Sequence, residues 1–187
     1  MFRKTIIRAI LAACLMAMPT IVRGAGSDST GAISITATVD NFAEWGDSAN
    51  DYTILATDFV HDGTQHTINL VNQTMTASRD LTLYSNVNVT LTAVAGAHSG
   101  ILTDSTNTYY LTTAYSLSGA NITPAIGYTG LLDSSVFFTA PVQYALAHQA
   151  GLGIYTVTLT VTASSPPAAA PEAGDYTCGL SLTAAWN

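Results

Sequence analysis

The residues of this 187-residue chain that could do chemistry are few and widely spaced. Of its four histidines, only His61 and His66 are close enough to suggest a metal pair, and they flank a turn; the others are His98 and His148. Zinc sites need three or four ligands at tighter spacing, so we expect neither a metal nor another cofactor. Serine and threonine are abundant, but no nucleophile–base arrangement stands out among them. We therefore expect no enzymatic activity.

The N-terminus has the features of an export signal. Three basic residues lie within the first eight, an apolar stretch follows over residues 9–22, and Val22-Arg23-Gly24 offers small residues where a signal peptidase inspects the chain. We predict a signal peptide over residues 1–24. Residues 11–14 also have the form of a lipobox, in which Cys14 would carry a lipid. The apolar run continues past Cys14, which fits an uninterrupted signal better.

Removal of the signal leaves an acidic chain. Four of the five basic residues lie within residues 1–24, so the exported chain has one basic residue, Arg79, against twelve acidic ones, for a net charge of −11. Nucleic acids and anionic membranes both attract clustered Lys and Arg, so neither is an expected partner. No later stretch is long and apolar enough to span a bilayer. We expect secretion without membrane insertion.

Most apolar segments alternate with threonine, serine or asparagine at every second position. Successive side chains of a strand point to opposite faces, so each such segment is predicted to be half buried. The alternating segments are residues 33–39, 81–93, 109–117, 155–161 and 176–186. With turn-forming clusters between them, they predict an antiparallel β-sandwich. Residues 134–150 are ambiguous between strand and short helix, and residues 164–174 are predicted to be an extended connector.

The alternating segment 33–39 follows a small, polar stretch at the start of the exported chain, and period two leaves two alternatives open for it. It is either the first strand of its own sandwich or a donor strand that adds to a sheet edge of another subunit. In the second case main-chain hydrogen bonds give affinity and every second side chain fills a pocket. Repeated head to tail, that contact makes an open filament.

Both ends of the exported chain resemble the chaperone–usher pilins, most closely the colonisation-factor (alpha-class) type. Ile33-Ser34-Ile35-Thr36-Ala37-Thr38-Val39-Asp40 is similar to their N-terminal donor strand. These pilins typically end in an alternating strand with a glycine fourteenth from the end and a penultimate aromatic residue. The matching positions here are Gly174, Tyr176, Cys178, Leu180, Leu182 and Trp186. Tryptophan replaces the commoner tyrosine at the penultimate position.

The resemblance implies a fold, a function and partners. The fold is an incomplete immunoglobulin-like antiparallel β-sandwich over residues 46–187, completed in trans by the N-terminal extension, residues 25–45, of a neighbouring subunit. The groove-filling side chains would be Ile33, Ile35, Ala37 and Val39. A periplasmic chaperone would pair with residues 175–186 until an outer-membrane usher exchanges it for the donor strand. The implied function is that of a structural subunit of an extracellular pilus, for surface attachment or biofilm.

Other functions stay open. TasA-like or archaeal bundling filaments also lend an N-terminal strand, and N-glycosylation sequons at Asn72, Asn88 and Asn121 would matter for an archaeal source. A secreted carbohydrate-binding module is an alternative of another class. Its sugar-stacking residues would be Trp45, Tyr52, Tyr109, Tyr110, Tyr128 and Trp186. Strand parity instead predicts that Tyr109 and Trp186 pack in the core.

Cys178 is the single cysteine of the exported chain, so an intrachain disulfide is excluded. It shares the parity of Tyr176, Leu180 and Leu182, which predicts a thiol that faces the core and packs as a small hydrophobe. An intersubunit disulfide is the alternative.

Overall fold

The structure is a computed structural model that describes residues 36–46, 53–60, 73–139, 143–165 and 171–186. The predicted signal peptide, Ile33, Ile35, His61 and His66 lie outside these ranges. By internal contacts the chain divides into Met1–Thr38 and Val39–Asn187. None of the helices in the described ranges is long and apolar enough to cross a membrane.

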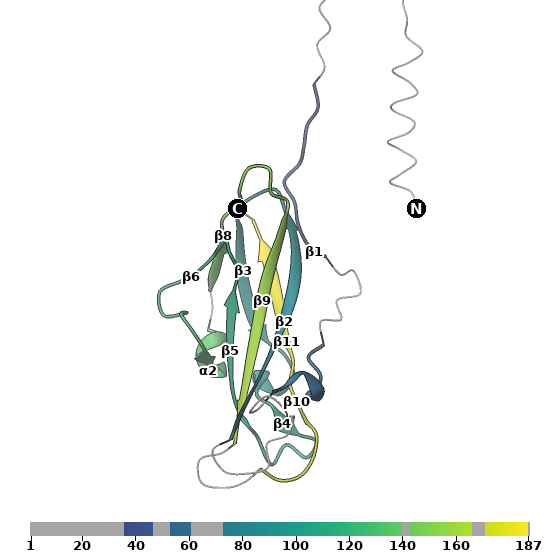
Figure 1. Ribbon diagram of the computed structural model, residues 1–187, viewed down its shortest axis with the longest axis vertical. Coiled ribbons are helices and arrows are strands. Elements are labelled where there is room, and N and C mark those ends of the chain that lie inside the picture. Colours follow the sequence, from purple (N-terminus) through teal and green to yellow (C-terminus); the bar gives the residue numbers. More distant parts are fainter. Residues whose placement is uncertain (1–35, 47–52, 61–72, 140–142, 166–170, 187) are drawn as a thin grey trace, which may run out of the picture. The chain divides into compact units, whose positions relative to one another are not determined.

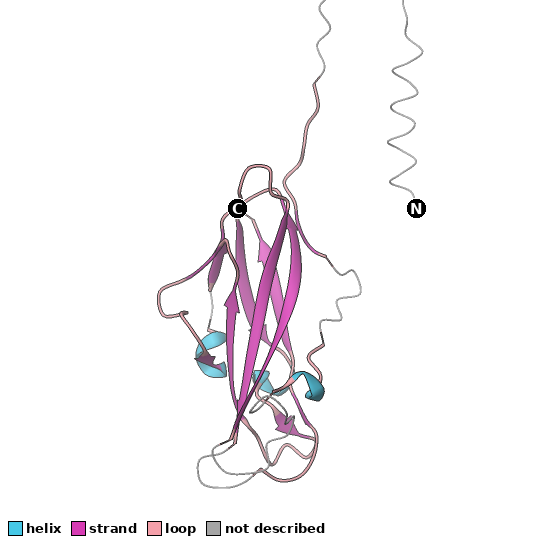
Figure 2. Cartoon of the chain, viewed as in Figure 1, coloured by secondary structure: helices cyan, strands magenta, loops and turns pink. Residues whose placement is uncertain are grey.

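Strands dominate the larger unit (Figure 2). They are β1 (Ala43–Trp45), β2 (Thr74–Ser85), β3 (Val89–Ala95), β4 (Thr103–Asp104), β5 (Thr112–Ser118), β6 (Ile122–Pro124), β7 (Leu132–Asp133), β8 (Tyr144–Leu146), β9 (Ile154–Ser164), β10 (Tyr176–Thr177) and β11 (Leu180–Ala185). The short helices are η1 (Ala56–Asp58), η2 (Ala97–Gly100) and α2 (Ser134–Phe137). Within the described ranges one sheet has the order β1-β2-β9-β5-β7, another β11-β3-β8-β6, and β10 pairs with β4 (Figure 1).

All strand pairings in these sheets are antiparallel, and the predicted alternation sets which face is buried. In β9, Tyr155, Val157 and Leu159 are buried, whereas the threonines between them lie on the other face. That outer face is held by hydroxyl contacts across to β2. The Oγ atoms of Ser78 and Thr160 are 2.9 Å apart, for example. The predicted all-β antiparallel architecture is confirmed.

One core lies between the two larger sheets. Leu83 of β2, Val157 of β9 and Leu91 of β3 belong to the same buried cluster and have no exposed side-chain area. Aromatic rings join the cluster at the side of β5 and β8, where the Tyr115 and Phe137 rings stack with centroids 5.2 Å apart. Each fully buried apolar side chain contributes about 1.5–3 kcal/mol to stability, so this shared core holds the two sheets together.

Two details add to the sequence predictions, and one corrects them. Residues 134–150 contain both a helix, α2, and a strand, β8. Tyr109 and Trp186, predicted to be core residues, are 46% and 44% exposed. The alternating strands do not extend to these two residues, because β5 begins at Thr112 and β11 ends at Ala185. In addition, residues 43–45 of the predicted extension form β1 and pair with β2.

A buried glutamine ties three elements together, and we predict that its amide matters more than its size. Gln143 has no exposed area; its Oε1 accepts from the Ala93 N–H and its Nε2 donates to the Phe137 C=O. Gln143→Leu leaves both backbone groups without this partner. We expect the free energy of unfolding in urea to fall by about 2–4 kcal/mol, since each buried unsatisfied group costs about 1–3 kcal/mol.

The control is Ser78→Ala on the exposed face of β2, which should change the free energy of unfolding by no more than about 0.5 kcal/mol. Equal effects of the two substitutions on the free energy of unfolding would contradict the stabilising role of the Gln143 amide.

Candidate functional site

The outer edge of β11 is the first part of the candidate site. On one side β11 pairs with β3, from Leu180 opposite Ala95 to Ala185 opposite Thr90. No strand within the described ranges pairs with the other side. Such an edge presents a row of backbone N–H and C=O groups that can bond another strand.

The inward side chains of this edge strand are incompletely covered. Leu180, Leu182 and Ala184 pack against the core yet are only half buried. In β3, the next strand of the same sheet, Leu91 and Ala93 are 0% and 1% exposed. Tyr176 and Cys178 continue the half-buried row toward the start of the strand. The sheet therefore runs out of cover at β11, where a further strand would bury this row.

The five-stranded sheet also has an edge on the β11 side of the core. β1, its edge strand, contacts β11, whereas β5 contacts β6 on the other side of the core. β1 pairs only with residues 83–85 of β2, and Val60 forms a single bridge to Thr76. Between these contacts no described strand pairs with the edge of β2. Trp45 of β1 and Ile54 are also half-buried neighbours of the core on this stretch of chain.

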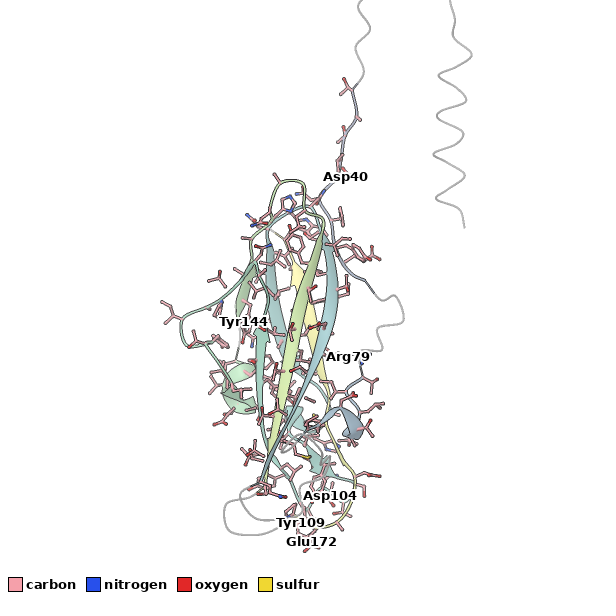
Figure 3. All side chains as sticks on the ribbon, in the orientation of Figure 1. Asp40, Arg79, Asp104, Tyr109, Tyr144 and Glu172 are labelled. Carbon is pink, nitrogen blue, oxygen red and sulfur yellow. The ribbon has the colours of Figure 1, made fainter. Side chains whose placement is uncertain are left out.

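Arg79 lies on this uncovered part of β2. It occupies the inward row between Ala77 and Leu81, which are 2% and 3% exposed, but its own side chain is exposed. Figure 3 shows Arg79 at the margin of the domain. An inward charge on an edge strand discourages non-specific sheet pairing. Arg79 thus places a positive charge beside the part of the β2 edge that no described strand pairs with.

The described part of the predicted donor strand makes no strand pairing. Residues 36–40 are exposed and have no regular secondary structure, and Val39 is 79% exposed. Val39, a predicted groove-filling residue, is thus unburied in the larger unit, and Ala37, another one, has no regular secondary structure in the shorter unit. Their remaining partners, Ile33 and Ile35, lie outside the described residues.

The chain that follows is clamped to the turn between β2 and β3. The Asn86 side chain donates from Nδ2 to the Asp40 C=O at 2.9 Å and accepts from the Phe42 N–H at 2.9 Å. The buried Ser85 Oγ donates to the Phe42 C=O at 3.1 Å. Asn86 thus binds residues 40–42 as a neighbouring strand would. We name the hydrogen bonds of Asn86 and Ser85 to Asp40 and Phe42 the clamp.

Cys178 lies in the half-buried row beside a tyrosine. The Tyr115 hydroxyl donates to the Gly100 C=O at 2.6 Å, so its oxygen accepts from the Cys178 thiol at 3.2 Å. Burial raises the pKa of the Cys178 thiol, and burial together with the Cys178 contact raises the pKa of Tyr115. Because the thiolate is the reactive form, Cys178 is a weak nucleophile at neutral pH.

At the other end of the domain Asp104 organises a loop. Its carboxylate accepts hydrogen bonds from the Thr106 hydroxyl and from the N–H groups of Thr106, Thr108 and Tyr109. These bonds, led by the Thr106 hydroxyl, lower the pKa of Asp104 from 3.8 to about 2. The carboxylate is thus a structural acceptor.

The aromatic residues proposed for sugar stacking do not form one platform. Trp186 follows the far end of β11, whereas Tyr109 lies beside Asp104, which pairs with Tyr176 ahead of that strand. Tyr52 lies outside the described ranges. Within those ranges no three His, Cys, Asp or Glu residues gather as a metal site would require.

Sequence reasoning proposed the C-terminal row as a site but did not single out Asn86, Asp104 or Arg79 as positioned residues. Asp104-Ser-Thr-Asn-Thr carries a signal that could have been used, because Asp followed by Thr and Asn favours side-chain-to-backbone turns. Asn86 carries no such signal, since its partners are more than 40 residues away in the chain.

We predict that Asn86→Ala releases the clamp. The Phe42 amide should exchange its hydrogen faster, and the free energy of unfolding should fall by about 1 kcal/mol, the typical worth of such bonds. Asn88→Ala is the matched control, because Asn88 Oδ1 accepts instead from the His148 N–H at 2.8 Å. Unchanged exchange at Phe42 in the Asn86 variant would refute the clamp.

The low pKa of Asp104 predicts a pH dependence. A carboxyl whose folded pKa is depressed adds stability above its ordinary pKa and loses it as pH falls through the folded value, here between 3.8 and about 2. Carboxyl NMR should place its titration midpoint near the lower value. Asp104→Asn should weaken the acid dependence of unfolding in that window; identical curves for both chains would contradict this assignment.

Comparison with protein-family models and with curated proteins finds no match for this chain. The features of the chain that bear on function are the unpaired edge of β11, the half-covered row and the clamped residues 40–42.

Proposed function

We propose that this chain is a structural subunit of an extracellular filament, which polymerises by donating residues 33–39 to the open edge of another copy. The observation that carries the proposal is the unpaired β11 edge with its half-buried row. An alternating apolar segment that pairs with nothing in its described part, Thr36–Val39, precedes the clamp. On this proposal each copy offers residues 33–39 as a donor strand and has the free edge of β11 as the acceptor.

The strand order supports an incomplete immunoglobulin-like fold. In that fold strands A, B, E and D form one sheet, and C, F and G the other. Taken in chain order, β1, β2, β3, β5, β9 and β11 correspond to strands A to F, and their arrangement β1-β2-β9-β5 against β11-β3 fits. Strand G would pair with the free side of β11. The missing strand is thus the one that a donor would supply.

The energetics favour such a contact. Buried apolar surface contributes about 25 cal/mol per Å². Three branched side chains and Ala37 on one face of a seven-residue strand would then contribute on the order of 5 kcal/mol before backbone hydrogen bonds are counted. The same strand would cover Leu180 and Leu182, which are only partly buried in the single chain.

An uncovered edge also explains why a pilus chaperone and usher are proposed partners. Edge strands with half-covered apolar rows promote aggregation, so a secreted subunit needs a temporary strand until it is assembled. A periplasmic chaperone would occupy the β11 edge, and an outer-membrane usher would exchange it for the next subunit. Spontaneous exchange, as in TasA-like filaments, is the variant of the same proposal without these partners. Either filament would serve surface attachment or biofilm formation.

Cys178 offers a direct assay for occupancy of the edge. We expect a peptide of residues 31–41 to slow the labelling of Cys178 by a small thiol reagent at least tenfold, because the added strand covers its row. The recipient is the exported chain with Ile33→Asp and Ile35→Asp, which cannot donate to itself. Size-exclusion chromatography should show a one-to-one complex.

Two substituted peptides test which face of the donated strand enters the groove. A peptide with Ile35→Asp places a charge in the groove and should give no protection, whereas Thr36→Asp places it outside and should protect fully. Equal labelling with and without the unchanged peptide would overturn the proposed function.

A further inference from the structure

The clamp leaves almost no linker between the donated strand and its own domain. The groove-filling residues end at Val39, and the next residue, Asp40, already accepts a hydrogen bond from Asn86. One residue of extended chain spans at most about 3.6 Å. A domain whose strand is accepted by a neighbour must therefore touch that neighbour directly. This inference rests on the proposed function and adds a second contact to it.

The surface around the clamp is apolar. Phe42, Tyr84, Leu152 and Ile154 are exposed there, and Tyr84 and Ile154 are cross-strand partners on β2 and β9. The Ser85 N–H donates to the Gly153 C=O, which ties the loop before β9 to the same place. We name this surface, defined by Phe42, Tyr84, Leu152 and Ile154, the exit end.

The direction of the accepted strand decides which surface the exit end meets. β11 ends at Ala185, opposite Thr90 and thus near the turn that carries Asn86. A donated strand parallel to β11 would finish there, on the surface from which the acceptor's own strand leaves. A head-to-tail filament needs two different surfaces. The donated strand must therefore run antiparallel to β11 and finish near Tyr176, at the opposite end of the domain.

That opposite end is hollowed. A shallow, widely open cavity of about 380 Å³ is lined by His98, Ser99, Ile101, Thr103, Asn107 and Tyr110. Tyr110 is 61% exposed, and Thr103 pairs with it in an isolated bridge beside β4 and β10. Figure 3 shows Asp40 and Tyr109 at opposite ends of the domain. We name the six lining residues the hollow end.

The hollow end is preformed. His98, Ser99 and Asn107 have φ angles of 54°, 54° and 58°, and they are the non-glycine residues with left-handed backbone in the described ranges. All three line the cavity. Such conformations persist only where surrounding contacts impose them, and they concentrate at functional sites. The Asp104 carboxylate supplies part of that restraint through the N–H groups of Thr106, Thr108 and Tyr109.

We propose that the hollow end of one subunit receives the exit end of the next copy, as a second contact at each filament junction. The apolar side chains around Phe42 and Ile154 would pack into the cavity beside Ile101 and Tyr110. The donated strand would then join the subunits, and the end-to-end contact would set the angle between successive domains.

Two substitutions, one on each surface, test the contact. In the exported full-length chain, Tyr110→Ser and Ile154→Ser should each shorten filaments at least tenfold in negative-stain images at equal protein concentration. The control is Ile126→Ser, which removes a fully exposed apolar side chain from the loop between β6 and β7 and should leave filament length unchanged.

Peptide binding separates this inference from the proposed function. The 31–41 peptide has no exit end. With each of the three substitutions placed in the Ile33→Asp and Ile35→Asp chain, it should therefore protect Cys178 equally, which also shows that each variant folds. Filaments of unchanged length and stiffness in Tyr110→Ser and Ile154→Ser, with peptide protection intact, would overturn the end-to-end contact alone. No peptide protection in the Ile33→Asp and Ile35→Asp chain without further substitution would overturn the proposed function.

Discussion

The free side of β11 is the constraint on which the rest of the account depends. A sandwich gains stability by covering the inward rows of both sheets, and among the described strands that cover is incomplete at Leu180, Leu182 and Ala184 of β11. The neighbouring strand β3 shows what full cover looks like in the same sheet. Both the polymerisation proposal and the proposed strand-lending partner follow from this incomplete burial. A strand added at β11 would pair with its backbone edge and cover its apolar side chains at the same time.

The domain also has features that give such an assembly a direction. Asn86 holds residues 40–42 at one end, and the cavity beside Tyr110 lies at the other. Arg79 places a charge in the inward row where cover is missing, which opposes casual sheet pairing. With a net charge of −11 after the predicted cleavage, the subunits of the proposed filament would also repel one another laterally. In that filament these charges would favour specific end-to-end association over non-specific clumping.

Much of the fold could be predicted because period-two alternation and burial express the same geometry. The rows of β9 and of β2 continuing into β3 have the predicted parity, and even Val87 in the turn stays half buried. Parity does not say where a strand stops, so Tyr109 and Trp186 were wrongly predicted to be core residues. Nor does it reveal long-range side-chain contacts. Gln143, Asn86 and the loop around Asp104 depend on neighbours that only the folded chain brings together.

The most direct test of the central claim is electron cryomicroscopy of filaments formed by the exported chain, with residues 33–39 traced in the map. The account predicts that this segment leaves its own domain at Asp40, lies antiparallel to β11 of the adjacent subunit, and places Ile33, Ile35, Ala37 and Val39 over its core. A segment that pairs within its own domain, or subunits that meet without strand exchange, would contradict the account.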